Sequence, residues 1–450
     1  MQLPQEYLQK MQNLLAKDYS KYIDAMQKPA VSAMRINPLK SNKNVIGAFS
    51  VVKKIDYADN GYIISSGKIG KHPYHIAGAV YVQEPSSMLP VIASDLTSEP
   101  SKANLTILDL CAAPGGKSGQ IAEILAGDGV LVSNEIDKRR AHVLQGNIER
   151  MGYQNVIITC ASPQELSRDL ANQFDYIFVD APCGGEGMFR KDSATICEWQ
   201  PQRILSNQKR QKEILVEANK MLKTGGKLIY STCTFAKEED EDVAVWFAQE
   251  YGYKLLSVPQ SVQQATTYLS HKECRRFYPF LSDGEGQFVC VMQKQSPANN
   301  QIRPYRLFDV GRTEQQILND FITNNFELEQ KPKFTKIGQN YCIINQKLAQ
   351  ILPFLQKLPV VNAGITIGTI DKNRLILHNN IFSALGHLAK NKLNFQVNDA
   401  NLAKYLHGEV LPNDNNFSGY VCIMADNLAI GGAKATGGEL KNLYPKGLRI

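Results

Sequence analysis

Two cysteines, Cys183 and Cys233, are the residues best placed to perform chemistry in this chain. Each thiol follows a short apolar run that reads as a β-strand, Cys183 within the segment DAPCGG and Cys233 within the segment STCT. In an open, mostly parallel sheet, ligands bind outside the carboxyl ends of the strands. We therefore expect both thiols to face one bound molecule, an arrangement that suits covalent attack on an electrophilic ring.

The surroundings of these two cysteines distinguish them from structural ones. Free cysteine usually behaves as a small buried hydrophobe, whereas Cys183 and Cys233 stand among proline, glycine and threonine residues. The other seven show no Cys-x-x-Cys spacing, so neither a zinc site nor a redox pair is indicated, and no metal is expected. These seven are interpreted as packing residues: Cys111, Cys160, Cys197, Cys274, Cys290, Cys342 and Cys422.

A glycine loop between a strand and a helix forms a second constellation. An apolar run at residues 105–109 precedes the segment CAAPGGKS at 111–118, after which the apolar positions follow a helical spacing. The paired glycines allow close backbone approach, and the helix N-terminus offers unpaired N–H groups to a polar ligand group. Twenty residues after Gly115 stands Glu135, where nucleotide-binding sheets place an acid that binds ribose hydroxyls.

The glycine spacing matches neither the dinucleotide fingerprint nor the triphosphate loop. A nucleoside with a small charged tail is therefore the better candidate for the ligand of this loop. A glycine turn or an acid after a strand is, by itself, often only a turn or a helix cap. The ordered series of strand, glycine loop, helix and acid is what favours a cofactor site.

At these motifs the chain resembles the RNA cytosine-C5 methyltransferases of the Nop2/Sun family. The flanking segments are similar to the bacterial RsmF-like branch, which acts on small-subunit ribosomal RNA. The end of the chain resembles the PUA-like RNA-binding domain of that branch. The matching segments are LDLCAAPGGK (108–117), DAPC (180–183), STCT (231–234), RINPLK (35–40), YVQEPSSM (81–88) and LKNLYPKGLR (440–449).

The resemblance implies an α/β fold of the class I methyltransferase type, with a doubly wound seven-stranded sheet and S-adenosyl-L-methionine as cofactor. Ser162 stands where many relatives carry an acid near the adenine, and its hydroxyl could still bind that edge. The expected cofactor-binding residues are Cys111, Ala112, Ala113, Pro114, Gly115, Gly116, Lys117, Glu135, Ser162 and Asp180.

The resemblance also assigns the catalytic roles. Cytosine C5 is a poor nucleophile, so a thiolate adds to C6 and makes C5 enamine-like, which lets C5 attack the cofactor's methyl group. By resemblance, Cys233 is the nucleophile and Cys183 assists release of the methylated product. Asp180, three residues before Cys183, is expected to hold the cytosine ring beside the cofactor.

Four segments are predicted along the 450 residues. The resemblance implies that residues 1–78 form an RNA-facing domain, whereas residues 79–296 alternate strands and helices, as expected of a catalytic domain. A polar linker at 295–300 precedes a mixed α/β segment at 304–385, and residues 386–450 form a small β-rich, PUA-like RNA-binding module.

Composition and charge agree with an RNA partner. The net charge is +7 and the pI is about 8.7, just under the value of about 9 that by itself indicates nucleic-acid binding. Lysines and arginines on the stretch 203–212 are interpreted as a solvated face. A second basic group near the end, separated by glycines and the aromatic Tyr444, is expected to contact RNA. This group comprises Lys434, Lys441, Lys446 and Arg449.

No apolar run of about eighteen residues and no signal peptide is found in the sequence. We therefore expect a cytoplasmic monomer that binds 16S ribosomal RNA or the small ribosomal subunit, and no membrane. Three alternatives stay open at this point: transfer RNA as the substrate, an RNA-binding assembly factor whose chemistry has lapsed, and a DNA cytosine methyltransferase. The last would use the Pro-Cys thiol and would not need Cys233.

Overall fold

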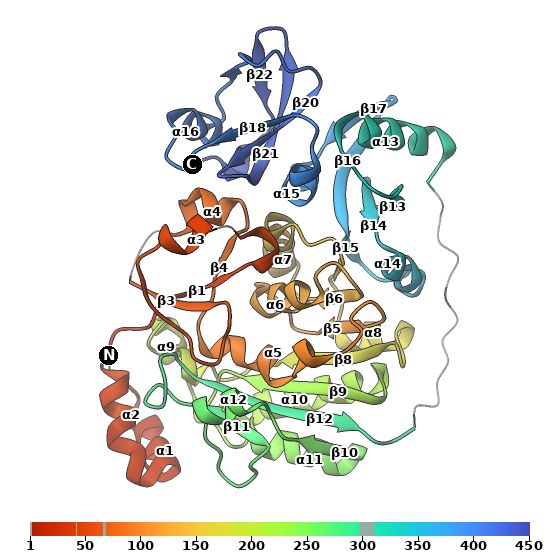
Figure 1. Cartoon of the computed structure of the whole chain (residues 1–450). Helices are drawn as coiled ribbons and strands as arrows, with labels where there is room; N and C mark the ends of the chain where they lie inside the picture. The colour runs from red at the N-terminus through yellow and green to blue at the C-terminus, as the bar shows by residue number, and fades with distance from the viewer. Residues whose placement is uncertain (1, 42, 66–68, 298–303, 305–309) are drawn as a thin grey trace.

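The computed structural model describes residues 2–41, 43–65, 69–297, 304 and 310–450. Within these residues the chain forms four β-sheets. The largest sheet lies in the lower half of Figure 1, the N-terminal sheet lies beside it, and the two C-terminal sheets lie above. Part of the predicted linker, residues 298–300, falls outside the described residues, as do residues 305–309.

The N-terminal part, over its described residues, contains four α-helices and a small antiparallel sheet. Its strand order is β2-β3-β1-β4, and β4 pairs with β1 through Met34 and Val82. The predicted boundary after residue 78 would therefore separate β4 from its own sheet. The elements are α1 (Gln5–Leu15), α2 (Tyr19–Met26), β1 (Ala33–Ile36), α3 (Lys43–Gly47), β2 (Val51–Lys54), β3 (Gly61–Ile64), α4 (Pro73–Ile76) and β4 (Val80–Val82).

The central sheet contains the seven strands that the family resemblance implies. Their order is β10-β12-β9-β8-β5-β6-β7, parallel from β9 to β7, with β12 antiparallel to β9 and to β10. This is the expected doubly wound methyltransferase sheet, and that prediction is confirmed. The strands are β5 (Thr106–Asp109), β6 (Val130–Asn134), β7 (Val156–Thr159), β8 (Phe174–Asp180), β9 (Leu222–Thr232), β10 (Tyr253–Leu256) and β12 (Gln287–Lys294).

Helices cover both faces of this sheet because its inner strands are apolar on both sides. Two buried clusters result, one on each face. One face packs against α8 (Pro163–Asp169), α10 (Pro201–Met221), α11 (Glu241–Tyr251) and α14 (Gln346–Ile351). The other packs against α5 (Leu89–Ala93), α6 (Gly116–Leu125), α7 (Lys138–Met151) and α12 (Gln260–Ala265).

Two further strands extend the sheet beyond the predicted seven. The strand β11 (Cys274–Phe277) pairs with β12, and β15 (Val360–Ala363) pairs antiparallel with the edge strand β7. Because β15 comes from the mixed α/β segment predicted at 304–385, that segment is partly built into the central sheet.

The C-terminal half forms two smaller sheets, ordered β13-β14-β16-β17 and β18-β20-β21-β22-β19. The second is the β-rich module expected at the end of the chain. The elements are α13 (Arg312–Asn325), β13 (Lys333–Ile337), β14 (Asn340–Ile344), β16 (Ile365–Asp371), β17 (Arg374–Leu377), α15 (Asn380–Leu385), β18 (Lys392–Phe395), α16 (Ala400–His407), β19 (Leu411–Pro412), β20 (Tyr420–Ala425), β21 (Leu428–Thr436) and β22 (Glu439–Asn442).

The half-buried side chain of Lys40 contacts three parts of the chain. Its Nζ donates to the carbonyl oxygens of Ala77, Arg150 and Ser383 at 3.1, 3.3 and 2.6 Å. Burial lowers the pKa of Lys40 to about 7. One buried apolar cluster also contains residues of both the N-terminal and the C-terminal sheets. The C-terminal module is therefore packed against the rest of the protein.

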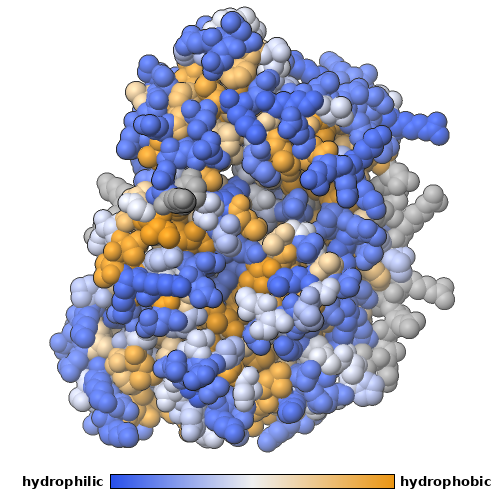
Figure 2. All heavy atoms as spheres, in the orientation of Figure 1, coloured by the Kyte–Doolittle hydropathy of each residue, from blue (hydrophilic) through white to orange (hydrophobic). Residues whose placement is uncertain are grey.

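Hydrophilic residues cover most of the surface in the view of Figure 2, with apolar patches between them, including one over the N-terminal sheet. Exposed apolar side chains of that part include Leu39, Ile46, Val52 and Val82. Among the described residues, no helix combines the length and the apolar character needed to cross a membrane.

Candidate active site

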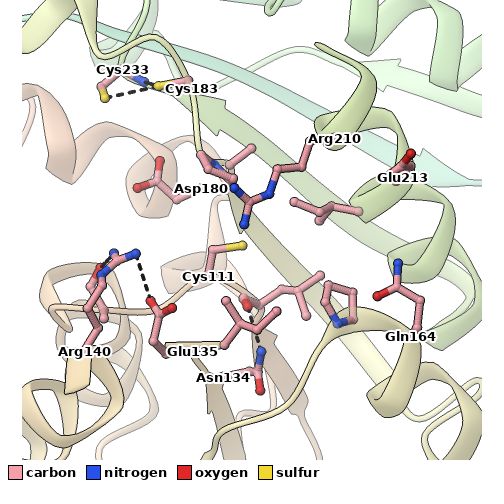
Figure 3. A pocket seen from close by; sticks show the side chains of 17 residues that line it. Cys111, Asn134, Glu135, Arg140, Gln164, Asp180, Cys183, Arg210, Glu213 and Cys233 are labelled. Atoms are coloured by element: carbon pink, nitrogen blue, oxygen red, sulfur yellow. Dashed lines mark hydrogen bonds and ion pairs between the residues drawn. The ribbon is translucent and has the colours of Figure 1, made fainter. Parts of the chain in front are cut away.

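A cavity of about 430 Å³ opens at the carboxyl ends of β5, β6, β8 and β9 (Figure 3). Acidic, basic and sulfur-bearing side chains from several strand ends and from α10 converge on it. Its lining residues are Leu110, Cys111, Ala113, Asn134, Glu135, Ile136, Arg140, Pro163, Gln164, Asp180, Ala181, Pro182, Cys183, Arg210, Glu213, Ile214 and Cys233.

The two thiols predicted to share a site do lie together. The Sγ atoms of Cys183 and Cys233 are 3.3 Å apart, and the backbone N–H of Cys233 donates to Cys183 Sγ at 3.3 Å. The adjacent parallel strands β8 and β9 place them, because Asp180 stands opposite Ser231 in the register. The hydrogen bond with Cys233 and burial raise the pKa of Cys183 well above its usual value. Cys183 is therefore held as a neutral thiol at neutral pH.

Asp180, at the end of β8, connects the thiols with the glycine loop. Its Oδ2 lies 2.8 Å from Lys117 Nζ, while its Oδ1 accepts hydrogen bonds from Ser231 Oγ at 2.8 Å and Gln287 Nε2 at 3.3 Å. Burial alone would lower the pKa of Lys117, but the negative charge of Asp180 outweighs it and the pKa is raised. Lys117 is thus a protonated ammonium beside Asp180.

Buried acids hold the loops that carry the thiols. Glu186 Oε2 accepts from the N–H of Phe235 at 3.0 Å, two residues after Cys233, and Glu186 Oε1 binds Lys10 Nζ of α1 at 2.5 Å. The N–H of Gly187 donates to the carbonyl oxygen of Cys233 at 2.9 Å. Helix α1 therefore helps to fix the loops that carry Cys183 and Cys233, a contact that the sequence analysis did not predict.

A second set of hydrogen bonds fixes the residues on either side of Cys183. Glu239 Oε2 accepts from the N–H of Gly184 at 3.1 Å and from Gln211 Nε2 at 2.8 Å, and Gln211 Nε2 also donates to the carbonyl oxygen of Pro182 at 3.0 Å. Burial raises the pKa of Glu239 to about 7. The loop that carries Cys183 is thus fixed on both sides of the thiol.

Glu135 lies at the opposite end of the cavity, with only 3% of its surface exposed. Its Oε1 accepts from the N–H of Asp137 at 3.0 Å, and its Oε2 lies 3.3 Å from Arg140 Nη1. Asn134 uses its side-chain amide to bridge Leu110 and Ala161, which fixes the neighbouring strand ends. Glu135 is therefore held in place with its carboxylate toward the cavity.

The glycine loop begins α6 as predicted, with Gly115 at the N-cap and a φ of +112° that disfavours a side chain. Of the seven predicted loop residues, Cys111 and Ala113 line the cavity. Ala112, Pro114, Gly115, Gly116 and Lys117 are not among the lining residues. They shape the loop, and Lys117 reaches the site through Asp180.

Ser162 is placed differently from the prediction. Its side chain forms a capping box with Glu165 at the start of α8 and does not line the cavity. The adjacent Pro163 and Gln164 line it instead. A serine three residues before a glutamate is the sequence pattern of a capping box. The sequence could therefore have predicted the capping role of Ser162.

Arg210 and Glu213 also line the cavity, although the stretch 203–212 was interpreted as a solvated face. Figure 3 shows the Arg210 guanidinium extending from α10 toward Asp180 and Cys111. Tyr444, expected as an aromatic surface for RNA, is only 4% exposed and packs 5.7 Å from the Tyr405 ring. Tyr444 is therefore a packing residue of the C-terminal module and offers no exposed aromatic surface.

Three family models match this chain. They are described as 16S rRNA methyltransferase RsmB/F, over residues 96–293, as the N-terminal domain of 16S rRNA methyltransferase RsmF, over residues 3–85, and as the methyltransferase RsmF PUA domain, over residues 392–450. The chain belongs to the RsmB/F methyltransferase family. The match places the cavity and both thiols in the methyltransferase domain of that family.

Curated relatives extend over almost the whole chain. Ribosomal RNA small subunit methyltransferase F of Vibrio parahaemolyticus is 27% identical, covering 99% of this chain and 97% of that protein. The protein of the same name from Cronobacter sakazakii is 28% identical over 99% of this chain and 96% of its own length.

Solved structures agree with the fold of this RsmB/F member. A methyltransferase homolog protein from Pyrococcus horikoshii is 29% identical, with a TM-score of 0.55 over 63% of this chain and 93% of that chain. The structure of NSun6 from Pyrococcus horikoshii with SFG, 20% identical, has a TM-score of 0.57 over 65% of this chain and 98% of that chain, and shows the shared fold.

Proposed function

We propose that this protein transfers a methyl group from S-adenosyl-L-methionine to C5 of a cytosine in 16S ribosomal RNA. The observation that carries the proposal is the pair of thiols, Cys183 and Cys233, whose sulfur atoms lie 3.3 Å apart beside the cavity. The full-length relatives named ribosomal RNA small subunit methyltransferase F support this RNA as the substrate.

The cavity residues fit this cofactor. Glu135 offers carboxylate oxygens to ribose hydroxyls, Ile136 and Pro163 offer apolar surface to an adenine ring, and Gln164 offers an amide to its polar edge. Between Glu135 and the thiols stands Cys111 of the glycine loop. When bound, the cofactor supplies an electrophilic methyl group.

Cys233 is the nucleophile in this proposal. Its sulfur adds to cytosine C6, which makes C5 nucleophilic toward the methyl group. Attack requires the thiolate form, and a nearby cation favours that form.

Asp180 and Lys117 position the base. The Asp180 carboxylate lines the cavity and is fixed by Ser231, Gln287 and Lys117. A fixed carboxylate there can accept a hydrogen bond from the exocyclic amine of cytosine. This contact holds C6 near Cys233 and stabilises the adduct.

Cys183 assists release of the product. After methyl transfer, solvent accepts the C5 proton, the C5–C6 double bond re-forms, and Cys233 leaves C6 as a thiolate. Cys183 lies directly beside the departing sulfur, and the brace formed by Gln211 and Glu239 keeps it there. Loss of its thiol would leave attack possible and slow elimination.

We further propose that the protein acts as a monomer in the cytoplasm, on 16S ribosomal RNA or the assembling small subunit. All nine cysteines carry free thiols, as a reducing compartment favours.

Bisulfite sequencing of ribosomal and transfer RNA tests the substrate. A strain without this protein should lack 5-methylcytosine at a position in 16S RNA and regain it with the wild-type chain. Unchanged 16S RNA with losses confined to transfer RNA would reject this substrate.

A further inference from the structure

A second cavity, of about 230 Å³, lies on the other side of Cys183. It is bounded by the loop that carries Cys183, by α9 (Ser193–Glu198) and by the first turns of α10. Cys183 lines both this cavity and the larger one described above. Whatever occupies the second cavity therefore lies next to the thiol pair.

Trp199 gives this cavity a fixed aromatic wall. Its Nε1–H donates to the buried carboxylate of Glu186 at 2.8 Å, and its ring meets the Tyr7 ring edge-on at 5.5 Å. The ring is half-buried and lines the cavity. A tryptophan fixed in this way can stack against a nucleotide base. Such base–aromatic stacking contributes much of the binding of unpaired nucleotides.

Helix α10 runs past both cavities. Arg203, Asn207 and Arg210 are spaced by four and three residues, so they share one face of the helix. Arg203 and Asn207 line the second cavity and Arg210 lines the first. The two guanidinium-bearing residues are about 10 Å apart along the helix axis. This face can follow a strand of RNA from one cavity to the next.

Arg203 is paired only weakly. Its Nη1 lies 3.1 Å from Glu198 Oε2, with 55% and 69% of the two side chains exposed. Exposed ion pairs contribute little stability, whereas a guanidinium–phosphate contact is charge-assisted and can be bidentate. A phosphate can therefore replace Glu198 as the partner of Arg203 at small cost.

We propose that the second cavity binds the nucleotide next to the target cytosine, with its base stacked on Trp199 and its phosphate contacted by Arg203. This inference rests on the proposed function. A cytosine held against Cys183 and Cys233 carries its strand neighbour to the mouth of this cavity. Asn207 offers an amide to the edge of that neighbouring base. The cavity would thus determine part of the sequence context in which cytosine is methylated.

A double-mutant cycle tests the stacking. The target cytosine is first mapped with the wild-type protein. RNA fragments carrying it are then made intact, or with an abasic nucleotide on its 5′ side or on its 3′ side. With wild-type protein, one abasic fragment should lower kcat/KM by about tenfold or more. With Trp199→Ala, intact and abasic fragments should react at the same reduced rate, because the stacking partner is already lost.

Two variants test whether Trp199 acts by stacking on a base or only by stabilising the local structure. Trp199→Phe keeps an aromatic face and loses the hydrogen bond to Glu186, so it should retain most of the discrimination between intact and abasic RNA. Leu205→Ala changes an exposed residue of the same helix, 64% accessible and lining neither cavity, and should behave as wild type. Binding of S-adenosyl-L-methionine, measured by calorimetry, should be unchanged in Trp199→Ala.

The outcomes distinguish the two proposals. Equal penalties for the abasic fragment in wild type and Trp199→Ala, with normal methylation by wild type, would overturn the second site alone. Loss of discrimination in Trp199→Phe to the same extent as in Trp199→Ala would assign Trp199 to positioning Glu186 and would also overturn it. Absence of cytosine methylation by the wild-type protein would overturn the proposed function, and the second site with it.

Discussion

Lys117 and Asp180 stand 63 residues apart in the sequence and meet at 2.8 Å, joining the glycine loop of α6 to the strand end that precedes the loop of Cys183. Both side chains are largely shielded, with 11% and 32% exposure. This ion pair therefore links the glycine loop, expected to bind the cofactor, to Asp180, expected to bind the base. A change at either residue should affect catalysis more than it affects cofactor affinity.

Asp180→Asn tests this connection. The amide keeps the shape of the carboxyl but removes the charge that pairs with Lys117 and the acceptor that faces the base. We expect the single-turnover rate of methyl transfer to fall by about 10²-fold or more, while S-adenosyl-L-methionine still binds. Glu250→Gln, an exposed substitution at the end of α11, serves as the control. A rate within a few-fold of wild type would contradict the role assigned to Asp180.

The cations of the C-terminal module give a second prediction. Lys434 and Lys441 stand opposite each other on β21 and β22, an arrangement of like charges that is unfavourable without an anion. Lys441→Ala combined with Lys446→Ala should weaken RNA binding and reduce the salt slope of the affinity by about one unit per lost phosphate contact. Cofactor affinity should not change.

The control for this pair is Lys331→Ala, which removes an exposed cation before β13. Point substitutions are preferable to deleting residues 386–450, because the module shares a buried apolar cluster with the N-terminal sheet and its loss would expose that surface. Equal RNA affinity and an equal salt slope for the double variant and the control would show that these lysines are not RNA contacts.

Glu239 predicts a particular dependence of stability on pH. Burial raises its pKa from 4.5 to about 7 in the folded protein, so the folded state binds a proton that the unfolded state has lost. Stability contributed by this group is present at low pH and falls as pH rises toward 7. Relative to wild type, Glu239→Gln should gain on the order of 2 kcal/mol between pH 4.5 and 7.

Chemical denaturation of both proteins across this pH range measures the difference. Asp109 has its pKa raised to about 7 by burial as well, and Lys40 has its pKa lowered to about 7. These groups affect wild type and variant alike and cancel in the comparison. Parallel stability curves would contradict a raised pKa at Glu239.

The sequence predicted the central sheet well because parallel strands buried on both faces read as continuous apolar runs. All seven predicted strands are present. The two thiols lie together, as expected for residues that follow the ends of the adjacent parallel strands β8 and β9. The additional strand β15 was not predicted, since its four residues VVNA gain their partner only when a distant segment reaches the edge strand β7. Such pairing depends on tertiary packing and leaves no local pattern.

The site was predicted less completely where side-chain direction decides the outcome. Arg210 and Arg203 belong to the same basic stretch, yet Arg210 lines the cavity at the strand ends and Arg203 the neighbouring one. Composition cannot distinguish these positions from a solvated face. The brace from α1 through Lys10 to Glu186 is similarly long-range, because it joins residues 176 positions apart.

The last prediction separates the two thiols. If Cys233 attacks C6, Cys233→Ala has no covalent route and should abolish methyl transfer and any denaturant-resistant RNA adduct. If Cys183 assists release, Cys183→Ala should still attack and methylate, and then accumulate on RNA because elimination stalls. Each variant is mixed with substrate RNA and S-adenosyl-L-methionine and run on a denaturing gel, where an adduct appears as a shifted band.

Cys197→Ala is the matched control for this experiment, because this exposed cysteine on α9 lies outside the lining of both cavities. It should turn over normally and leave no band. A band with Cys233→Ala and none with Cys183→Ala would exchange the two roles, as in the DNA-type arrangement. Full activity in both variants would exclude covalent catalysis, because either thiol has then been removed without effect although their sulfur atoms lie only 3.3 Å apart.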